Sequence, residues 1–300
     1  MHRRDLLISG LAAGSAVAAA TAAQPALAAA PRYPTIRAKD GTYLFHRDWG
    51  EGRPVVFVAS WALTSEMWAY QVAHLSEVGF RCIAYDRRGH GRSDAPTGGY
   101  DMDSLADDLA AVIDATGAPQ VDLVTHSMGG AEAIRYLGRH GTARVRKVAM
   151  LAPAAPCLVA GPDNPYGAPR AVFEGRLAEW RADFPKWVRD NQAPFFTPQT
   201  SQPMQEWLIA QLLTTPTPVA IATFRGLFEA DVRPDLARID RPTLVLHGDK
   251  DASAPLEITG ARVAAGVKGA ELKVYPGAPH GLFVTHMERV NRDLETFLKA

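Results

Sequence analysis

Cysteine is scarce in this 300-residue chain, which contains only Cys82 and Cys157. Two cysteines are too few for a disulfide framework or for a metal site built from thiolates. The chain also lacks an excess of either charge, because 32 Lys and Arg balance 32 Asp and Glu. A nucleic-acid-binding protein normally carries a surplus of basic residues. We therefore expect no nucleic-acid partner, and a globular enzyme is the default interpretation.

The chain has a long uncharged, Ala-rich segment near its start, at residues 6–23. Arg3 and Arg4 precede this segment, and Ala-x-Ala sites follow it. This order is typical of a secretory signal, and the arginine pair resembles the twin-arginine signal of proteins that fold before export. We predict that residues 1–30 are such a signal peptide and that the mature protein is periplasmic or secreted, with no stable membrane association. The alternative is an uncleaved anchor, because the segment just reaches the minimum length of a membrane span.

Short apolar runs alternate with amphipathic, helix-like segments in the rest of the chain. Asp103 is expected to cap the helix that ends near Gly117. Alternation of this kind indicates a mostly parallel sheet with helices on both faces. The expected strands are residues 35–38, 42–48, 55–59, 80–85, 121–125, 145–151, 243–247 and 271–275.

The alternation stops between residues 153 and 234. This segment holds many prolines and aromatic residues but no run typical of a buried strand. We predict that residues 153–234 form a helical lid, inserted into a core made of residues 31–152 and 235–300. Most of the aromatic side chains are expected to form the lid's own core, and a few to line a substrate pocket.

The strongest local motif is HSMGG, at residues 126–130, between an expected strand and an expected helix. A sharp turn in this context exposes a serine hydroxyl above the sheet, as in the nucleophile elbow of serine hydrolases. Thr125 stands where the general Gly-x-Ser-x-Gly pattern has its first glycine. The motif alone fits an ordinary strand-to-helix turn equally well, so Ser127 needs support from partner residues.

A nucleophilic serine needs a histidine base and an acid, in the chain order Ser, Asp or Glu, then His. His280 follows an expected strand, and Asp249 and Asp251 follow the strand before it. Loops at the carboxyl ends of parallel strands gather at one edge of the sheet, where active sites form. Both aspartates remain candidates on this argument. Of the other histidines after Ser127, His140 is expected to point away from the site at the end of a helix, His247 to pack at a strand end, and His286 to be exposed to solvent at the start of a helix.

Several motifs together resemble the α/β-hydrolase superfamily. Within it, the chain looks most like the bacterial arylesterases, perhydrolases and cofactor-free haloperoxidases, over residues 35–298. The segments that carry the resemblance are YDRRGHGRS at 85–93, HSMGG at 126–130, HGDKD at 247–251 and YPGAPHG at 275–281.

This resemblance implies an α/β-hydrolase fold, with a mostly parallel central sheet, helices on both faces and an inserted helical lid. It also implies that Ser127 is the nucleophile, Asp251 the acid and His280 the base, which leaves Asp249 as a structural aspartate. No metal or organic cofactor is expected, and the expected partner is a small-molecule ester. Relatives assemble into oligomers, so a homo-oligomer is compatible with the resemblance.

The oxyanion site departs from the family pattern. Relatives have His-Gly-Trp after the first buried strand, whereas this chain has Ala59-Ser60-Trp61. The resemblance implies that the backbone N–H groups of Trp61 and Met128 hold the oxyanion. The missing glycine puts the position of the Trp61 N–H in question. We predict that the Ser60 hydroxyl serves as an additional donor.

Two further groups are interpreted as structural. The polar loop at residues 86–92, with sequence DRRGHGR, could suggest phosphate binding, but in this family it is a turn. His126, beside the nucleophile, is expected to brace the elbow without titrating during catalysis.

These features predict a serine carboxylic-ester hydrolase that acts through an acyl-enzyme. The nearest alternative is resolution of the same acyl-enzyme by hydrogen peroxide, which gives a peracid. Relatives of that kind often carry proline after the tryptophan, where this chain has Ala62. Cleavage of lactones or thioesters is a further alternative. A non-catalytic ligand-binding protein on a hydrolase scaffold is the most distant one.

Overall fold

The computed structural model describes residues 34–300, so the predicted signal peptide lies outside the described residues. Eight strands form one sheet, in the order β1-β2-β4-β3-β5-β6-β7-β8. The sheet is antiparallel where β1, β2 and β4 pair, and parallel from β4 across to β8. The strands are β1 (Thr35–Arg37), β2 (Tyr43–Trp49), β3 (Arg53–Val58), β4 (Phe80–Tyr85), β5 (Val121–His126), β6 (Val145–Leu151), β7 (Thr243–Gly248) and β8 (Glu271–Tyr275).

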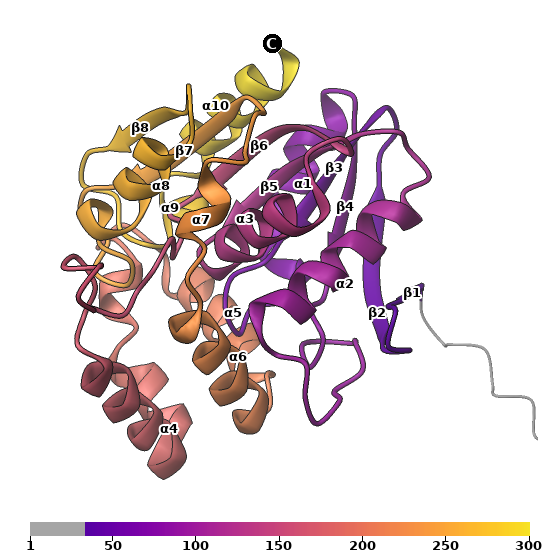
Figure 1. The fold of residues 1–300 in the computed structure, drawn as a ribbon. Helices are drawn as coiled ribbons and strands as arrows, with labels where there is room; N and C mark the ends of the chain where they lie inside the picture. The colour runs from indigo at the N-terminus through magenta and orange to yellow at the C-terminus, as the bar shows by residue number, and fades with distance from the viewer. Residues whose placement is uncertain (1–33) are drawn as a thin grey trace, which may run out of the picture. The chain divides into compact units, whose positions relative to one another are not determined.

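Helices cover both faces of the sheet, with α2 and α3 on the face turned toward the viewer in Figure 1. Side chains alternate along each strand, so Val56 and Val58 of β3 pack in the core that contains α2, α3 and α8. Val55 and Phe57 pack in the opposite core, which contains α1, α9 and α10. The helices outside the predicted lid, together with α7 at its border, are α1 (Ala69–Glu77), α2 (Met102–Ala115), α3 (Met128–His140), α7 (Arg233–Leu236), α8 (Gly260–Gly266), α9 (Leu282–Thr285) and α10 (Met287–Lys299).

Helix α2 begins two residues earlier than the sequence pattern suggests. Asp101, and not Asp103, is the N-cap, because its side chain accepts the Ser104 N–H at 2.9 Å. A capping side chain reaches the N–H three residues ahead, and Asp101 has the extended backbone that this geometry requires. Asp103 lies instead in the first turn, where it pairs with Arg135 of α3 at 3.3 Å.

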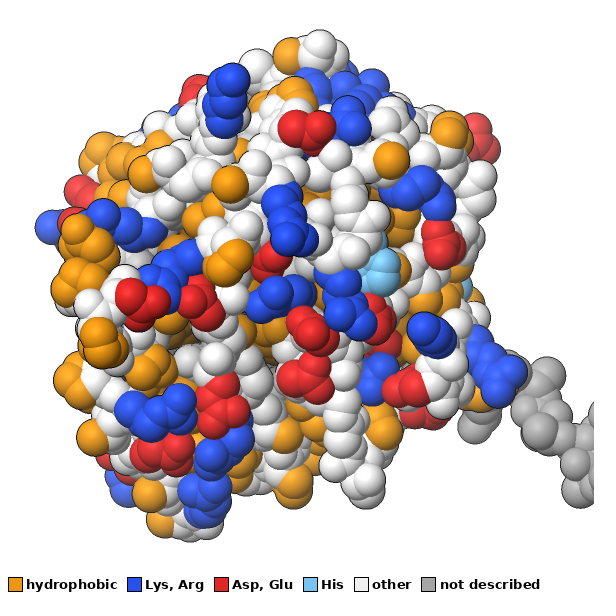
Figure 2. All heavy atoms as spheres, viewed as in Figure 1, with side chains coloured by type: hydrophobic (Ala, Val, Ile, Leu, Met, Phe, Trp, Pro, Cys, Tyr) orange, Lys and Arg blue, Asp and Glu red, His pale blue; other side chains and the backbone are white. Residues whose placement is uncertain are grey.

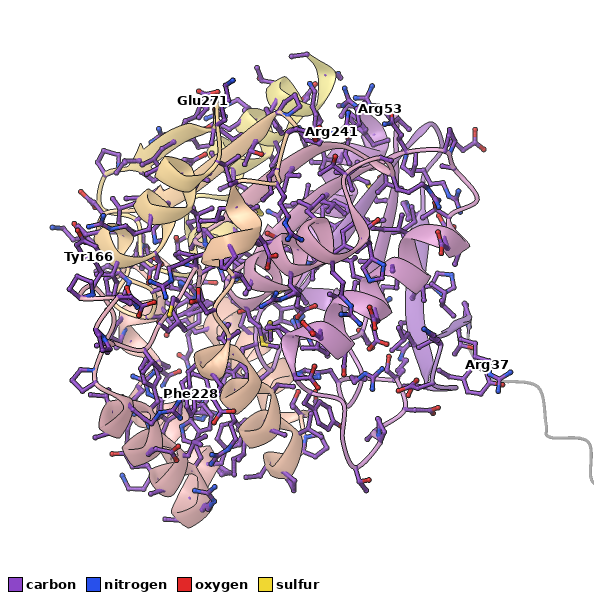
Figure 3. All side chains as sticks on the ribbon, viewed as in Figure 1. Arg37, Arg53, Tyr166, Phe228, Arg241 and Glu271 are labelled. Carbon is purple, nitrogen blue, oxygen red and sulfur yellow. The ribbon has the colours of Figure 1, made fainter. Side chains whose placement is uncertain are left out.

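Three long helices lie between β6 and β7, in the segment predicted to be a lid. They are α4 (Arg170–Asp190), α5 (Gln202–Leu213) and α6 (Thr217–Glu229). In Figure 3, Arg53 and Glu271, the first residues of β3 and β8, mark the edge where strands begin. Phe228 of α6 lies at the opposite end of the molecule in that view, beside α4. The three helices therefore cover the carboxyl edge of the parallel strands.

Within residues 34–300, no single helix is long and apolar enough to cross a membrane. Helices α5 and α6 pass such a test of length and composition only as a pair, and this pair is bent by 90°.

Acidic and basic side chains are interspersed over the face seen in Figure 2, without a broad area of one sign. Between α2 and α3, for example, Arg139 pairs with Asp107 at 2.7 Å. Exposed pairs of this kind each contribute about 0–1 kcal/mol to stability.

Candidate active site

The candidate site lies where the chain reverses its direction of travel across the sheet. From β3 the chain moves to β4 on one side, and it later returns to place β5 on the other side. Loops that leave two such strands diverge and open a crevice at their carboxyl ends. The segment 59–61 follows β3 and Ser127 follows β5, so both border this crevice.

Ser127 occupies a strained turn between β5 and α3. Its φ of 54° and ψ of −119° lie in a region that side-chain-bearing residues rarely adopt. The turn is held by the Ser127 N–H, which donates to the Leu151 carbonyl at 3.0 Å. A Cβ on Gly129 would stand 2.5 Å from the Val58 carbonyl oxygen, so only glycine lets α3 approach β3 this closely. This is the geometry that a nucleophile elbow requires.

A continuous line of hydrogen bonds joins Ser127, His280 and Asp251. His280 Nε2 lies 2.9 Å from Ser127 Oγ, and His280 Nδ1 lies 2.6 Å from Asp251 Oδ2. All three side chains are buried, with Ser127 and Asp251 6% exposed and His280 4%. Because Nδ1–H donates to the carboxylate, Nε2 is free to accept the serine O–H. The structure thus brings together the three residues that the sequence predicts.

The Asp251 carboxylate is held in its ionised form. Burial opposes the charge, but His280, His247 and the backbone together lower the pKa of Asp251 well below its usual range. Its second oxygen, Oδ1, accepts the N–H groups of Ser253 at 2.9 Å and Ala254 at 2.8 Å. These bonds fix both the charge and the direction of the carboxylate.

Asp249 takes a different position. It is exposed, and its Oδ1 accepts the Gly277 N–H at 2.7 Å. This bond fastens the loop after β8, which leads to His280. Of the two candidate acids, only Asp251 contacts the histidine.

His247 packs at the end of β7, as the sequence predicts, and there it lies against the site. This fully buried side chain donates from Nε2 to the Ala254 carbonyl at 2.8 Å, and Nε2 is also 3.2 Å from Asp251 Oδ2. It therefore braces the turn that carries Asp251. The signal in the sequence was its position at the end of a strand, four residues before the acid.

The remaining histidines lie away from the nucleophile or act as supports. His126 donates from Nε2 to the His280 carbonyl at 2.9 Å, and burial lowers its pKa to about 3, so its ring stays neutral. His140 pairs with Asp107 at the end of α3. His286 is half-buried beside Tyr275, with ring centroids 6.1 Å apart.

Two backbone N–H groups are available for an oxyanion. Among residues 34–300, the N–H groups of Trp61 and Met128 donate to no protein acceptor. Met128 is the first residue of α3, where the helix dipole adds positive potential. Ser60 and Trp61 line the same pocket as Ser127 and His280.

Arg87 is the residue whose contribution the sequence could not show. Its buried guanidinium donates to the carbonyls of Ala59 at 2.7 Å and Ser60 at 3.0 Å, and it pairs with Glu132 of α3. The loop after β3 is thereby fastened to the helix that follows Ser127. The rest of the polar loop is also engaged internally: Arg88, for example, binds the Asp108 carboxylate with both Nε and Nη2 at 2.6 Å.

An apolar pocket opens beside the hydrogen-bonded residues. Its walls come largely from lid aromatics, and more of these line the pocket than the few that the sequence predicts. Trp61 connects the segment after β3 to the lid helices. Its ring stacks on Trp180 of α4, with centroids 4.5 Å apart, and its indole N–H donates to the Ala220 carbonyl of α6 at 2.9 Å. The wall residues include Phe173, Trp180, Trp187, Phe196, Phe224 and Leu227.

Comparisons with known proteins agree with this geometry. The chain is 38% identical over 274 residues to a non-heme chloroperoxidase of Kitasatospora aureofaciens, an alignment that covers 88% of this chain and 99% of the relative. It is 34% identical over 277 residues to a bifunctional esterase/perhydrolase of Acinetobacter calcoaceticus, with the same coverage of 88% and 99%.

Solved structures show the same relationship. An esterase from Exiguobacterium antarcticum matches with a TM-score of 0.86 at 31% identity, covering 89% of this chain and 100% of that one. A family model described as the alpha/beta hydrolase fold matches residues 53–287. The fold class and the family resemblance predicted from the sequence are confirmed, and the chain belongs to the α/β-hydrolase family.

Proposed function

We propose that this protein is a serine hydrolase that cleaves small carboxylic esters through an acyl-enzyme. The observation that carries the proposal is the buried line of hydrogen bonds from Asp251 through His280 to Ser127, at 2.6 and 2.9 Å, beside an apolar pocket. A strained serine at the head of a helix, with a histidine in reach of its hydroxyl, is the arrangement used for nucleophilic attack on carbonyl carbon. Relatives named as esterases support this chemistry.

In the first half of the reaction, Ser127 Oγ attacks the ester carbonyl carbon while His280 Nε2 accepts the serine proton. The carbonyl oxygen gains negative charge as the tetrahedral intermediate forms. The N–H groups of Trp61 and Met128 donate to this oxygen. Asp251 holds the imidazole in the required tautomer and stabilises its positive charge.

The intermediate then collapses, and the bond between the carbonyl carbon and the leaving alkoxide breaks. His280 donates its proton to that alkoxide, which departs as an alcohol. Water attacks the acyl-enzyme next, with His280 accepting its proton and returning it to Ser127 Oγ. The carboxylic acid leaves and the free enzyme is restored.

A second candidate is attack by hydrogen peroxide in place of water, which gives a peracid. The relative named as a bifunctional esterase/perhydrolase favours this alternative. Hydrolysis stays the first candidate because Ala62 stands where relatives of the peracid-forming kind often carry proline, and Ala62 has a φ of 55°. Proline holds φ near −65° and cannot adopt this turn. A proline-bearing relative must therefore shape this loop differently.

The deciding experiment compares the wild-type protein with Ser127→Ala, using nitrophenyl esters of increasing acyl length and a fluorophosphonate label. We expect the variant to fold, to lose essentially all turnover and to escape the label. Substantial turnover in the variant would place the nucleophile elsewhere. An unlabelled, inactive wild-type protein would support a non-catalytic scaffold. Peroxide and bromide added to the same assay, with a phenolic dye as halogen acceptor, measure the share of peracid formation.

A further inference from the structure

One cation in the pocket has no counter-ion. Arg176 of α4 lines the same pocket as Ser127. The structure records neither an ion pair nor a hydrogen bond for its guanidinium anywhere in residues 34–300. By contrast, Arg170 of α4 and Arg225 of α6 each pair with the carboxylates of both Glu174 and Glu229.

The guanidinium lies among aromatic rings. Its central carbon is 5.8 Å from the ring centroid of Trp187 and 5.7 Å from that of Phe224. Burial lowers the pKa of Arg176, and Glu179 opposes this effect only partly. Guanidinium stays protonated in proteins nonetheless. Ring faces offset part of the lost hydration of a cation, but a carboxylate does so far better.

Aromatic rings of the pocket lie near both this cation and the oxyanion segment. The Phe224 ring is near both groups, at 5.8 Å from the ring of Trp61, which follows the oxyanion segment, and at 5.7 Å from the Arg176 guanidinium carbon. Trp180 is placed similarly, with its ring 4.5 Å from Trp61 and 5.0 Å from Trp187. A substrate that reaches both groups therefore contacts apolar side chains.

Polar groups accompany Arg176 on the lid side. Asn191 and Gln192, just after α4, also line the pocket. The Asn191 amide is oriented by a hydrogen bond from Nδ2 to the Trp187 carbonyl at 2.9 Å. The pocket lining thus combines Ser127 and His280, a majority of apolar side chains, one arginine and two amides.

We infer that Arg176 binds a carboxylate on the substrate, so that the preferred esters are half-esters of dicarboxylic acids. The scissile ester would lie at Ser127, the methylene chain along the aromatic walls, and the free carboxylate at the guanidinium. Arginine suits this contact because its planar fork can hold both carboxylate oxygens. This inference rests on the proposed esterase function and adds its substrate class.

The test uses pairs of nitrophenyl esters that differ in one charge. Mono-nitrophenyl adipate carries the free carboxylate, and its methyl-capped counterpart has the same chain without the charge. We expect the wild-type kcat/KM to favour the charged ester. Arg176→Met should lower the ratio of the two kcat/KM values by about 10- to 100-fold, the range of a charge-assisted hydrogen bond. Arg176→Lys should retain part of the preference, because the charge remains.

Arg181→Met is the matched control. Arg181 lies on the same helix but is exposed and does not line the pocket. The ratio of the two kcat/KM values for Arg181→Met should therefore equal that of the wild type. A wild-type enzyme without preference for the charged ester, or an Arg176→Met variant with an unaltered ratio, would overturn the inference. Neither result would touch the esterase proposal, which fails if Ser127→Ala still turns over the neutral ester or if the wild-type protein is inactive and unlabelled.

Discussion

At the scale of single residues, the two aspartates after β7 have separate environments although only one residue lies between them. Asp251 is buried and bonded to His280, whereas Asp249 is exposed and bonded to the Gly277 N–H. Because the pKa of Asp251 lies well below its usual range, its carboxylate stays ionised through mildly acidic pH. We therefore expect that activity lost at mildly acidic pH does not come from protonation of Asp251.

Asp251→Asn should lower kcat by about 10³- to 10⁴-fold, because an amide no longer enforces the tautomer in which Nε2 accepts the Ser127 proton. Asp249→Asn should act mainly on stability, through the Gly277 contact. Steady-state kinetics and urea unfolding of both variants check this pair. The reverse pattern would identify Asp249 as the catalytic acid.

Ser60 allows a prediction about the transition state. Its side chain lines the pocket beside Ser127, and its carbonyl is held by Arg87 at 3.0 Å. If the hydroxyl donates to the oxyanion, Ser60→Gly and Ser60→Ala should both lower kcat by about tenfold with little change in KM, less than the 10²- to 10³-fold of a principal donor. A higher kcat in Ser60→Gly would show that the serine misplaces the Trp61 N–H. Identical kinetics in all variants would place position 60 outside the oxyanion site.

At the scale of elements, the loop after β3 and helix α3 are coupled by one buried ion pair. Arg87 pairs with Glu132 and also holds the carbonyls of Ala59 and Ser60, while Tyr85 donates to the second Glu132 oxygen at 3.3 Å. Burial raises the pKa of Glu132, and Arg87 counteracts that rise. Breaking the pair leaves a carboxylate in the interior without a counter-charge, although Tyr85 still donates to it.

Arg87→Met should therefore destabilise the protein by about 3–5 kcal/mol, the usual cost of an orphaned buried charge. Adding Glu132→Leu removes that charge and should recover much of the stability, but it cannot restore the bonds to the loop after β3. In the double variant, the free energy of unfolding should therefore recover towards the wild-type value, while kcat should stay low. Recovery of both would limit the pair to a structural role.

At the scale of the whole molecule, the predicted leader stands apart from the residues that the structure describes. Residues 1–30 lie outside the described residues, and export, signal cleavage and oligomeric state stay predictions. The described part, residues 34–300, holds the whole matched family region. The predicted leader can therefore be tested separately from the enzyme.

Replacing Arg3 and Arg4 with lysine should retain the precursor in the cytoplasm, because the twin-arginine route depends on that pair. Mass spectrometry of the retained protein should find residues 1–30 still attached. Unchanged export would instead indicate the general secretory route or a misread leader.

The sequence by itself determined the order of strands and helices, and it predicted Ser127 and His280 as candidate catalytic residues, whereas Asp251 was preferred over Asp249 only through the family resemblance. Buried strands are short apolar runs, and catalytic residues at strand ends carry signals that are local in the chain. The N-cap of α2 was missed because Asp101 and Asp103 are chemically alike, and only backbone geometry distinguishes them.

Only the tertiary structure decided the contacts between distant segments. Glu132 stands 45 residues beyond Arg87 in the chain, and no local pattern indicates that the two would pair beside the loop after β3. Arg176 reads in the sequence as one more charge on a helix, because neither its ring neighbours nor its missing counter-ion can be seen there. Burial and partnership are properties of packing, and packing brings together residues that the chain order keeps apart.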